Sequence, residues 1–332
     1  MAHLIGAVGT AHSPLVSEQP EFWPKHGQFE KEHARVLLDA YGGGEWETLS
    51  REKSSWIGKE IAPETMKSRF EAAQKAVAVL KSILFDRMQP DVLVIIGDDQ
   101  DDVFPHERYM PAIAMYGGAT MVNAPRDLSK LPDWWANAAW GHYPVDGPEE
   151  YPCEPDLAKH LVTSLISQGF DITFVTDPPE ERHVGHAFTF LSRRLMNGRY
   201  IPIVPIMLNT YFPPNQPPVA RAYELGRALR KAIEGWPADK KVVVAASGGL
   251  THPIVDEKLD RSVLDAIAKK DKAALVGLSE NVFRLGTSEI KNWIAVAGAM
   301  EESDQRMKLI DYIPAYRTTA GTGCGLAFAE WA

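Results

Sequence analysis

Histidine and carboxylate side chains follow a pair of glycines in the stretch 243–260, which reads V-V-A-A-S-G-G-L-T-H-P-I-V-D-E-K-L-D. The apolar run predicts a buried strand, and the glycines let backbone come close to a ligand. The loop after the strand carries Thr251, His252, Asp256 and Glu257. Imidazole and carboxylate groups transfer protons and bind metal ions, so we expect this loop to form the floor of a site.

Two further loops carry polar side chains directly after apolar runs. His12 lies in T-A-H-S-P after the run 3–9, and Gln100 lies in G-D-D-Q-D-D after the run 91–96. Ligands in α/β sheets collect at the carboxyl ends of strands, where we expect both residues to lie. The acidic run has two interpretations, a Ca²⁺ or Mg²⁺ loop and a solvated turn. It lacks the glycine and the distal glutamate of an EF-hand.

A second pair of histidines, His183 and His186, occurs in E-E-R-H-V-G-H-A-F. Gly185 separates them, so their spacing alone does not indicate a metal pair. The S-G-G sequence at 247–249, combined with His186 or His252, leaves a hydrolase arrangement open, although G-x-S-x-G is absent. Phosphate-loop and dinucleotide-binding glycine patterns are also absent at strand-to-helix junctions.

Hydrophobic periodicity predicts the elements that position these residues. Apolar runs indicate strands, and apolar spacings of three or four indicate helices. The expected strands cover 3–9, 91–96, 172–175, 201–208, 241–246 and 309–315, and the expected helices cover 63–88, 155–169, 219–233, 263–268, 272–278 and 288–299. A turn is expected at 318–323. This alternation predicts an α/β fold, and the length of 332 residues is compatible with one large domain or two.

Composition excludes several classes of protein. The chain has 35 basic and 44 acidic residues and a net charge of -9, which argues against a nucleic-acid or anionic-membrane binder. No segment reaches the roughly 18 apolar residues of a membrane span, and the N-terminus lacks signal-peptide features, so we expect a cytoplasmic protein. Cys153 and Cys324 are far apart in sequence, which excludes a disulfide scaffold and a thiolate zinc site. Any metal must therefore bind histidine and carboxylate.

Six motifs in a fixed order resemble those of a known enzyme family. They are T-A-H-S-P, P-D-V-L-V-I-I-G-D-D-Q, V-G-H-A-F, P-I-M-L-N-T-Y-F-P-P, S-G-G-L-T-H and Y-I-P-A-Y-R-T-T-A-G-T-G. The chain is similar to the catalytic subunit of class III extradiol ring-cleavage dioxygenases, in the branch of the methylgallate and gallate dioxygenases near protocatechuate 4,5-dioxygenase. The match spans nearly the whole chain.

The resemblance implies an αβ sandwich with a central, mostly parallel or mixed sheet flanked by helices. It implies one catalytic domain over 1–332, with irregular excursions at 18–60 and 106–152. The family binds non-haem Fe(II) through two histidines and a glutamate and acts on a catecholic aromatic acid and O₂. His12 matches the first ligand, and Glu257 is expected as the glutamate, with Lys258 at that position in the alternative register. Gln100 stands where the family has its second histidine.

The resemblance also implies roles for other residues. His186 matches the acid/base histidine of the family, and His252 matches the histidine of the glycine loop, so both are expected to be catalytic. Tyr316 and Arg317 are expected to contact a substrate carboxylate. The further residues expected to bind substrate are Tyr211, His183 and Thr251. A chain of this kind is expected to form a homodimer or a higher homo-oligomer.

Three functional hypotheses follow from these observations. The favoured hypothesis is an Fe(II) extradiol dioxygenase that cleaves the ring of a gallate-like or other catecholic acid. His12 and Glu257 are its expected metal ligands, and Gln100 or a nearby aspartate completes the site. Because Gln100 replaces a ligand histidine, the alternative is a metal-independent hydrolase, lyase or decarboxylase of an aromatic-derived acid that uses His12, His186 and His252 for proton transfer. The third is a non-catalytic binding protein on this fold.

Overall fold

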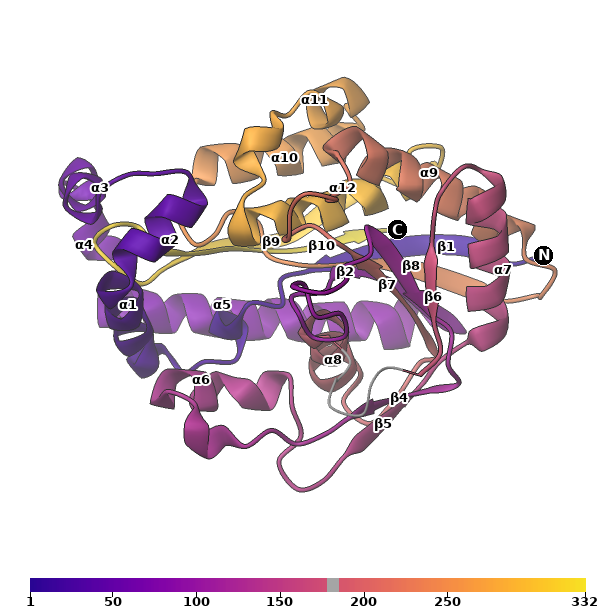
Figure 1. Ribbon diagram of the computed structural model, residues 1–332, viewed down its shortest axis with the longest axis horizontal. Helices are drawn as coiled ribbons and strands as arrows, with labels where there is room; N and C mark the ends of the chain where they lie inside the picture. The colour runs from indigo at the N-terminus through magenta and orange to yellow at the C-terminus, as the bar shows by residue number, and fades with distance from the viewer. Residues whose placement is uncertain (178–184) are drawn as a thin grey trace.

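A central sheet organises the protein, whose computed structural model describes residues 1–177 and 185–332 (Figure 1). Its eight strands lie in the order β6-β3-β7-β2-β8-β1-β10-β9. Their bounds are β1 His3–Thr10, β2 Val92–Asp98, β3 Ile113–Tyr116, β6 Thr173–Val175, β7 Ile203–Leu208, β8 Lys241–Ser247, β9 Met307–Tyr316 and β10 Gly323–Trp331. The α/β fold expected from the sequence is confirmed.

The four central strands, β7, β2, β8 and β1, are parallel to one another. β10 and β9 extend the sheet antiparallel beyond β1, and β3 pairs antiparallel with β7 on the other side, so the sheet is mixed. β1, β8 and β2 are adjacent and parallel, so their carboxyl ends lie at one edge of the sheet. The loops that carry the predicted site residues therefore converge there.

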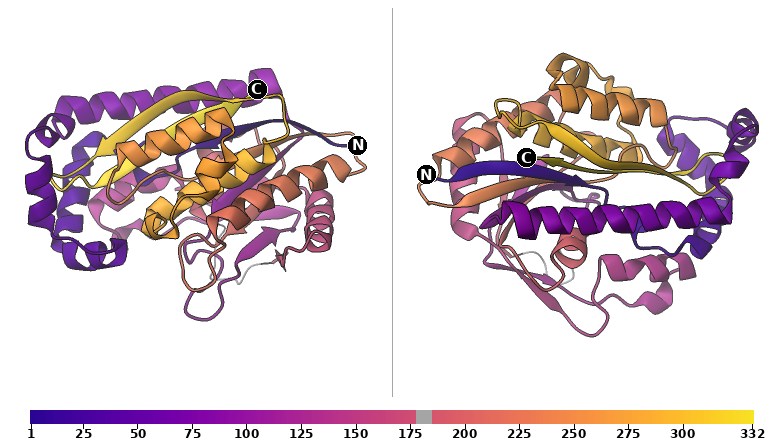
Figure 2. Two further views of the ribbon diagram at one scale, coloured as in Figure 1. Left: turned by 90° about the horizontal axis from the view of Figure 1, so that it is seen from above. Right: turned by 180° about the vertical axis from the view of Figure 1, so that it is seen from behind.

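Helices cover both faces of the sheet, as the views in Figure 2 show. Apolar side chains of α7, α9, α10 and α12 form a core with one face, and those of α5 and α8 form a second core with the other. Burial on both faces explains why the central strands are continuous apolar runs. The bounds are α5 Pro63–Ser82, α7 Pro155–Ser167, α8 His186–Phe190, α9 Val219–Gly235, α10 Glu257–Lys269, α11 Lys272–Val276 and α12 Ile290–Ala299.

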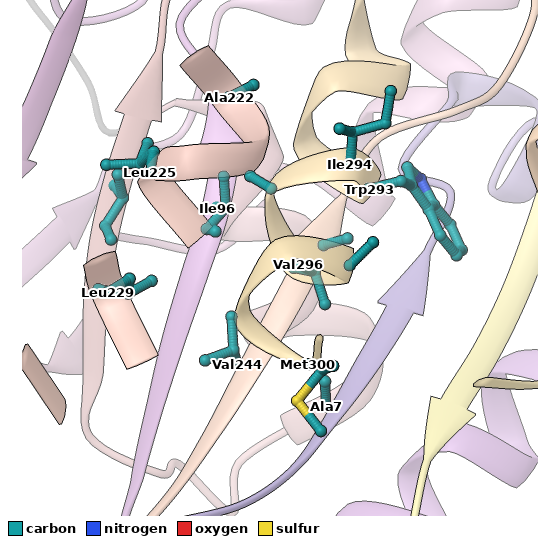
Figure 3. Packing of buried hydrophobic residues seen from close by; sticks show 14 of the residues in the cluster. Ala7, Ile96, Ala222, Leu225, Leu229, Val244, Trp293, Ile294, Val296 and Met300 are labelled. Atoms are coloured by element: carbon teal, nitrogen blue, oxygen red, sulfur yellow. The ribbon is translucent and has the colours of Figure 1, made fainter. Parts of the chain in front are cut away.

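The α12 helix packs tightly between α9 and the sheet (Figure 3). Its side chains Trp293 and Val296 lie in the same core as Val244 of β8. A Cβ atom at Gly226 of α9 would lie 1.8 Å from the backbone oxygen of Ala295, so only glycine permits this close contact. The contact fixes α12 and the residues at its N-terminus, which belong to the site described below.

The remaining segments lie at the end of the sheet away from the N-terminus (Figure 1). They are α1 Trp23–Glu32, α2 Ala34–Tyr41, α3 Trp46–Lys53, α4 Ile57–Glu60 and α6 Asp133–Ala138. The excursion at 18–60 thus contains several short helices. A separate two-stranded sheet pairs β4 Thr120–Asn123 with β5 Glu149–Pro152.

Three sequence expectations need correction. The segment 106–152 is not wholly irregular, because it supplies β3, β4 and β5. The turn expected at 318–323 is present, but no strand was expected after it, and Gly323–Trp331 is β10, buried along its whole length between β1 and β9. The helix expected to begin at residue 263 begins at Glu257, because the side chain of Asp256 accepts a hydrogen bond from the backbone N–H of Leu259.

In the described part of the chain, no helix is long and apolar enough to cross a membrane.

Candidate active site

Four segments bring buried polar side chains together at the carboxyl edge of the central strands. His12 follows β1, Asp98 is the last residue of β2, and Ser247 is the last residue of β8. Glu289 ends the 3₁₀ turn Leu285–Glu289 that leads into α12. The Nε2 atom of His12 lies 3.5 Å from Oε2 of Glu289 and 4.0 Å from Oδ1 of Asp98.

Ser247 fixes the orientation of the His12 ring. The hydroxyl of Ser247 donates to the backbone oxygen of Ala187 at 2.6 Å. The Ser247 oxygen therefore accepts from Nδ1–H of His12, which lies 2.9 Å away. This assigns the proton to Nδ1 and leaves the lone pair on Nε2. That nitrogen is buried and has no hydrogen-bond partner among the described residues, so it is free to bind a ligand beside the carboxylates.

Gln100 holds the two carboxylates in place. Its amide nitrogen donates to Oδ2 of Asp98 at 2.8 Å and to Oε1 of Glu289 at 2.9 Å. The other oxygen of Glu289 accepts from the backbone N–H of Gly249 at 2.7 Å, and Oδ1 of Asp98 accepts from Nδ2 of Asn292 at 3.3 Å. Oδ1 and Oε2 are the oxygens nearest to His12.

Electrostatics at this position favour a cation. Burial raises the pKa of Asp98, and the neighbouring Glu289 carboxylate raises it further. Burial also acts to raise the pKa of Glu289, but His252 and His12 outweigh this effect and hold it well below its usual range. The carboxylates of Asp98 and Glu289 and the Nε2 lone pair of His12 lie close together, and such a set of donors fits a divalent metal ion.

His252 reaches the same carboxylate from the glycine loop. Its Nδ1 lies 2.8 Å from the backbone oxygen of Leu250, and its Nε2 lies 3.2 Å from Oε1 of Glu289. Burial acts to lower the pKa of His252, but Cys324 and Glu289 outweigh it and raise the pKa well above its usual range. A protonated His252 donates one hydrogen bond to the backbone oxygen of Leu250 and one to Oε1 of Glu289, and it thereby orients Glu289.

His186 lies on the opposite side of His12, with the two ring centroids 4.8 Å apart. Asp102 accepts from its Nδ1–H at 2.7 Å and from its backbone N–H at 3.1 Å. Burial acts to lower the pKa of His186, but Asp102 outweighs it and raises the pKa to about 9. His186 also belongs, with His12 and Asp98, to a group whose potential ligand atoms lie within 4.8 Å of one another. Its position fits either a proton donor or a further ligand.

These groups line a cavity of about 780 Å³, a volume typical of small-molecule sites. His12, His186, His252, Gln100 and Glu289 form its polar floor. Its outer wall comes from α1, α2 and the α6 region and is largely apolar or aromatic, with Phe29, Leu37, Trp134, Trp135 and Tyr143. The cavity therefore combines a charged floor with walls suited to an aromatic ring.

The structure separates the residues that the sequence assigned to the site. Tyr211 and Arg317 line the cavity with the three histidines and Gln100, whereas Tyr316 lines a different hollow. Thr251 is buried and binds Asp260 through its backbone N–H and its hydroxyl, so it shapes the loop. His183 lies outside the described residues.

The structure places Glu289, rather than the expected Glu257, next to His12. Glu257 lies in the first turn of α10, where its side chain accepts from the hydroxyl of Tyr316 at 3.0 Å and lines the second hollow. Lys258, on the same turn, is exposed and does not line the cavity. Because α10 begins early, both side chains point away from His12.

Sequence reasoning missed the roles of four residues. Asp98 and Asp102 lie in the acidic run, but their sequence gives no sign of which aspartates turn inward. Glu289 and Asn292 lie in a segment interpreted only as helix. One signal could have identified them. The segment 288–299 is mostly apolar, as a buried helix is, and buried polar side chains such as Glu289 and Asn292 are costly unless they are paired.

Comparison with known proteins identifies the family of this chain. Residues 55–327 match the family described as the catalytic LigB subunit of aromatic ring-opening dioxygenase. The chain belongs to this family, which confirms the resemblance found in the sequence. Membership supports aromatic ring opening at the level of the family.

Individual relatives are more distant. Gallate dioxygenase from Pseudomonas putida is 28% identical over 171 residues, which are 48% of this chain and 49% of that protein. The chain thus matches about half the length of this curated relative. A solved structure of an uncharacterized protein from Escherichia coli K12 is similar with a TM-score of 0.44 and 14% identity, covering 77% of this chain and 92% of that one.

Proposed function

We propose that this protein is an Fe(II)-dependent dioxygenase that opens the ring of a catecholic aromatic acid. The single observation that carries the proposal is the unpartnered Nε2 of His12, which faces the Oδ1 atom of Asp98 and the Oε2 atom of Glu289 inside the cavity. These three side chains would hold the metal. Family membership supports the reaction class.

Bound iron would supply coordination positions for a vicinal diol and O₂ and the electronic path between them. The residues of the chain do the remaining work. Ser247 fixes the ring of His12, while Gln100 and His252 fix the two carboxylates. His186, positioned by Asp102, moves protons beside the ring oxygens.

A catecholic acid is the proposed substrate class. The floor of the cavity is polar at one end, and aromatic side chains form its outer wall, which suits a planar ring. The relative from Pseudomonas putida is a gallate dioxygenase, which supports gallate-like acids as the first compounds to test.

The arrangement of Gln100 bears on the metal-independent alternative. That hypothesis rested on the loss of a ligand histidine at this position. In this proposal Gln100 orients the carboxylates rather than binding the metal, which is supported by the donation of its amide nitrogen to Asp98 and Glu289. Asp98 is instead the third donor near His12, so the substitution does not argue against a metal.

Oxygen uptake after anaerobic loading with Fe(II) tests the proposal. Gallate and 3,4-dihydroxybenzoate are expected to cause stoichiometric oxygen consumption and the appearance of a ring-opened product by mass spectrometry. Glu289→Gln should abolish uptake, whereas Glu257→Gln should retain it. Full turnover of an aromatic acid by metal-stripped protein, without oxygen consumption, would reject the proposal in favour of hydrolysis or lysis.

A further inference from the structure

Two arginines, Arg126 and Arg317, line the cavity in the described part of the chain, and they differ in what they contact. Arg317 is buried and paired with Glu30. Its Nη2 lies 2.5 Å from Oε1 and its Nε lies 3.2 Å from Oε2 of this carboxylate, and its Nη1 donates to Nδ1 of His26 at 3.3 Å. The carboxylate of Glu30 balances the charge of Arg317, so Arg317 has little attraction left for a substrate carboxylate.

Arg126 has donors to spare. It follows β4 and makes one ion pair, from Nη2 to Oδ1 of Asp102 at 3.3 Å. Its Nε–H is buried and has no hydrogen-bond partner among the described residues. A buried donor without a hydrogen-bond partner destabilises the protein. A ligand oxygen that accepts from this donor removes that penalty, which favours binding.

The side chain of Arg126 is also held in position. Its guanidinium carbon lies over the ring of Tyr143, 4.2 Å from the ring centroid, in a cation–π contact that limits its movement. Asp102 uses its other oxygen, Oδ2, for His186. Arg126 is thus fixed next to the residue that moves protons.

Charge divides the cavity into two ends. Asp98 and Glu289 make the floor near His12 suited to a cation. Asp102 shares its single negative charge between Arg126 and His186, so the charge of Arg126 is only partly balanced. An aromatic ring that carries a diol on one side and a carboxylate on the other matches this polarity.

We propose that Arg126 binds the carboxylate of the substrate and thereby selects aromatic acids over neutral catechols. The inference rests on the proposed function for the placement of the diol, but the selection of an anion depends on Arg126 itself. It replaces Tyr316 and Arg317 as the expected carboxylate contacts. A guanidinium fixed in plane forms paired, charge-assisted hydrogen bonds with a carboxylate.

Equilibrium binding under anaerobic conditions tests this inference without turnover. The probes are 3,4-dihydroxybenzoate and catechol, which differ only in the carboxylate, and binding is followed by calorimetry with Fe(II)-loaded protein. Wild type is expected to bind the acid more tightly than catechol. Arg126→Gln should weaken binding of the acid by about 10- to 100-fold, while binding of catechol changes less than about 3-fold. Arg126→Lys should fall between wild type and Arg126→Gln.

Arg199→Gln is the matched control, since Arg199 also stacks on an aromatic ring, that of Phe85, but does not line the cavity. It should leave both affinities unchanged. The inference is overturned if Arg126→Gln retains the affinity for the acid, if it loses both probes equally, or if wild type does not discriminate between them. Absence of ring cleavage would leave this test intact, because only binding is measured.

Discussion

The side-chain nitrogen of Gln100 lies 2.9 Å from Oε1 of Glu289, and the same nitrogen lies 2.8 Å from Oδ2 of Asp98. Gln100, which the resemblance set at the position of a ligand histidine, therefore binds the two carboxylates beside His12. Because an amide N–H₂ donates two hydrogen bonds, one residue orients both acidic groups. The acidic side chains that face Nε2 of His12 are Asp98 and Glu289.

Removing the amide of Gln100 should weaken metal binding without abolishing it. Gln100→Leu keeps a similar size but removes one hydrogen bond from Asp98 and one from Glu289. Loss of such orienting contacts typically lowers metal affinity about 10- to 100-fold. Competition with a chelator of known affinity measures the change. Gln168→Leu is the control, because it removes an amide contact at an exposed position just after α7. Its metal affinity should match that of wild type. An unchanged affinity in Gln100→Leu would contradict the orienting role.

Replacing His186 separates proton transfer from metal binding. His186→Gln should lower kcat about 100- to 10,000-fold, the usual contribution of a general acid or base. Iron content should remain at the wild-type level, because His12, Asp98 and Glu289 are untouched. His3→Gln, an exposed histidine on β1, provides the control. If His186→Gln loses its iron, His186 is a ligand in the group that it forms with His12 and Asp98.

A buried network behind the cavity wall contains an acid that must be neutral. Nη1 of Arg317 donates to Nδ1 of His26, so this nitrogen is an acceptor. Oε2 of Glu18 lies 3.1 Å from the same nitrogen, and it can bond there only if Glu18 carries a proton. Burial agrees with this assignment, since it raises the pKa of Glu18 from 4.5 to about 8.

The raised pKa of Glu18 makes stability depend on pH. Between the unfolded value of 4.5 and the folded value of about 8, the folded protein holds a proton that the unfolded chain has released. The contribution of this group to the free energy of unfolding is thus fully present below the unfolded pKa. It falls by on the order of 1.4 kcal/mol per pH unit as pH rises toward the folded value.

Glu18→Gln should remove this dependence, because the amide donates to His26 without titrating. Urea unfolding at pH 5, 6, 7 and 8 provides the measurement, with the difference in unfolding free energy between variant and wild type growing as pH rises. Glu21→Gln, at a neighbouring exposed position, should follow wild type. A difference that stays constant with pH would show that Glu18 is ionised in the folded protein.

Much of the fold followed from the sequence because local patterns carry it. The continuous apolar runs of β2, β7 and β8 and the spacing of α5 and α9 reflect burial on one or both faces. β10 was missed because its glycines and its position at the chain end resemble a turn. Its strand state depends on pairing with β1 and β9, which is not a local property.

The site was only partly predictable for the same reason. His12 and His252 stand next to strand ends, so their place was evident from order along the chain. Glu289 reaches His12 only because α12 packs against β8 and α9, and no local motif marks it. The family resemblance placed the glutamate ligand at Glu257, but this residue begins α10 behind the cap at Asp256, and its side chain contacts Tyr316.

Iron binding by two glutamine variants tests the central claim most directly. Wild type, Glu289→Gln and Glu257→Gln are dialysed anaerobically against Fe(II), and bound metal is measured by elemental analysis. We predict about one iron per chain in wild type and in Glu257→Gln and a loss of at least about tenfold in affinity in Glu289→Gln, since the lost carboxylate faces His12. Full iron binding by Glu289→Gln, or its loss in Glu257→Gln, would contradict the account.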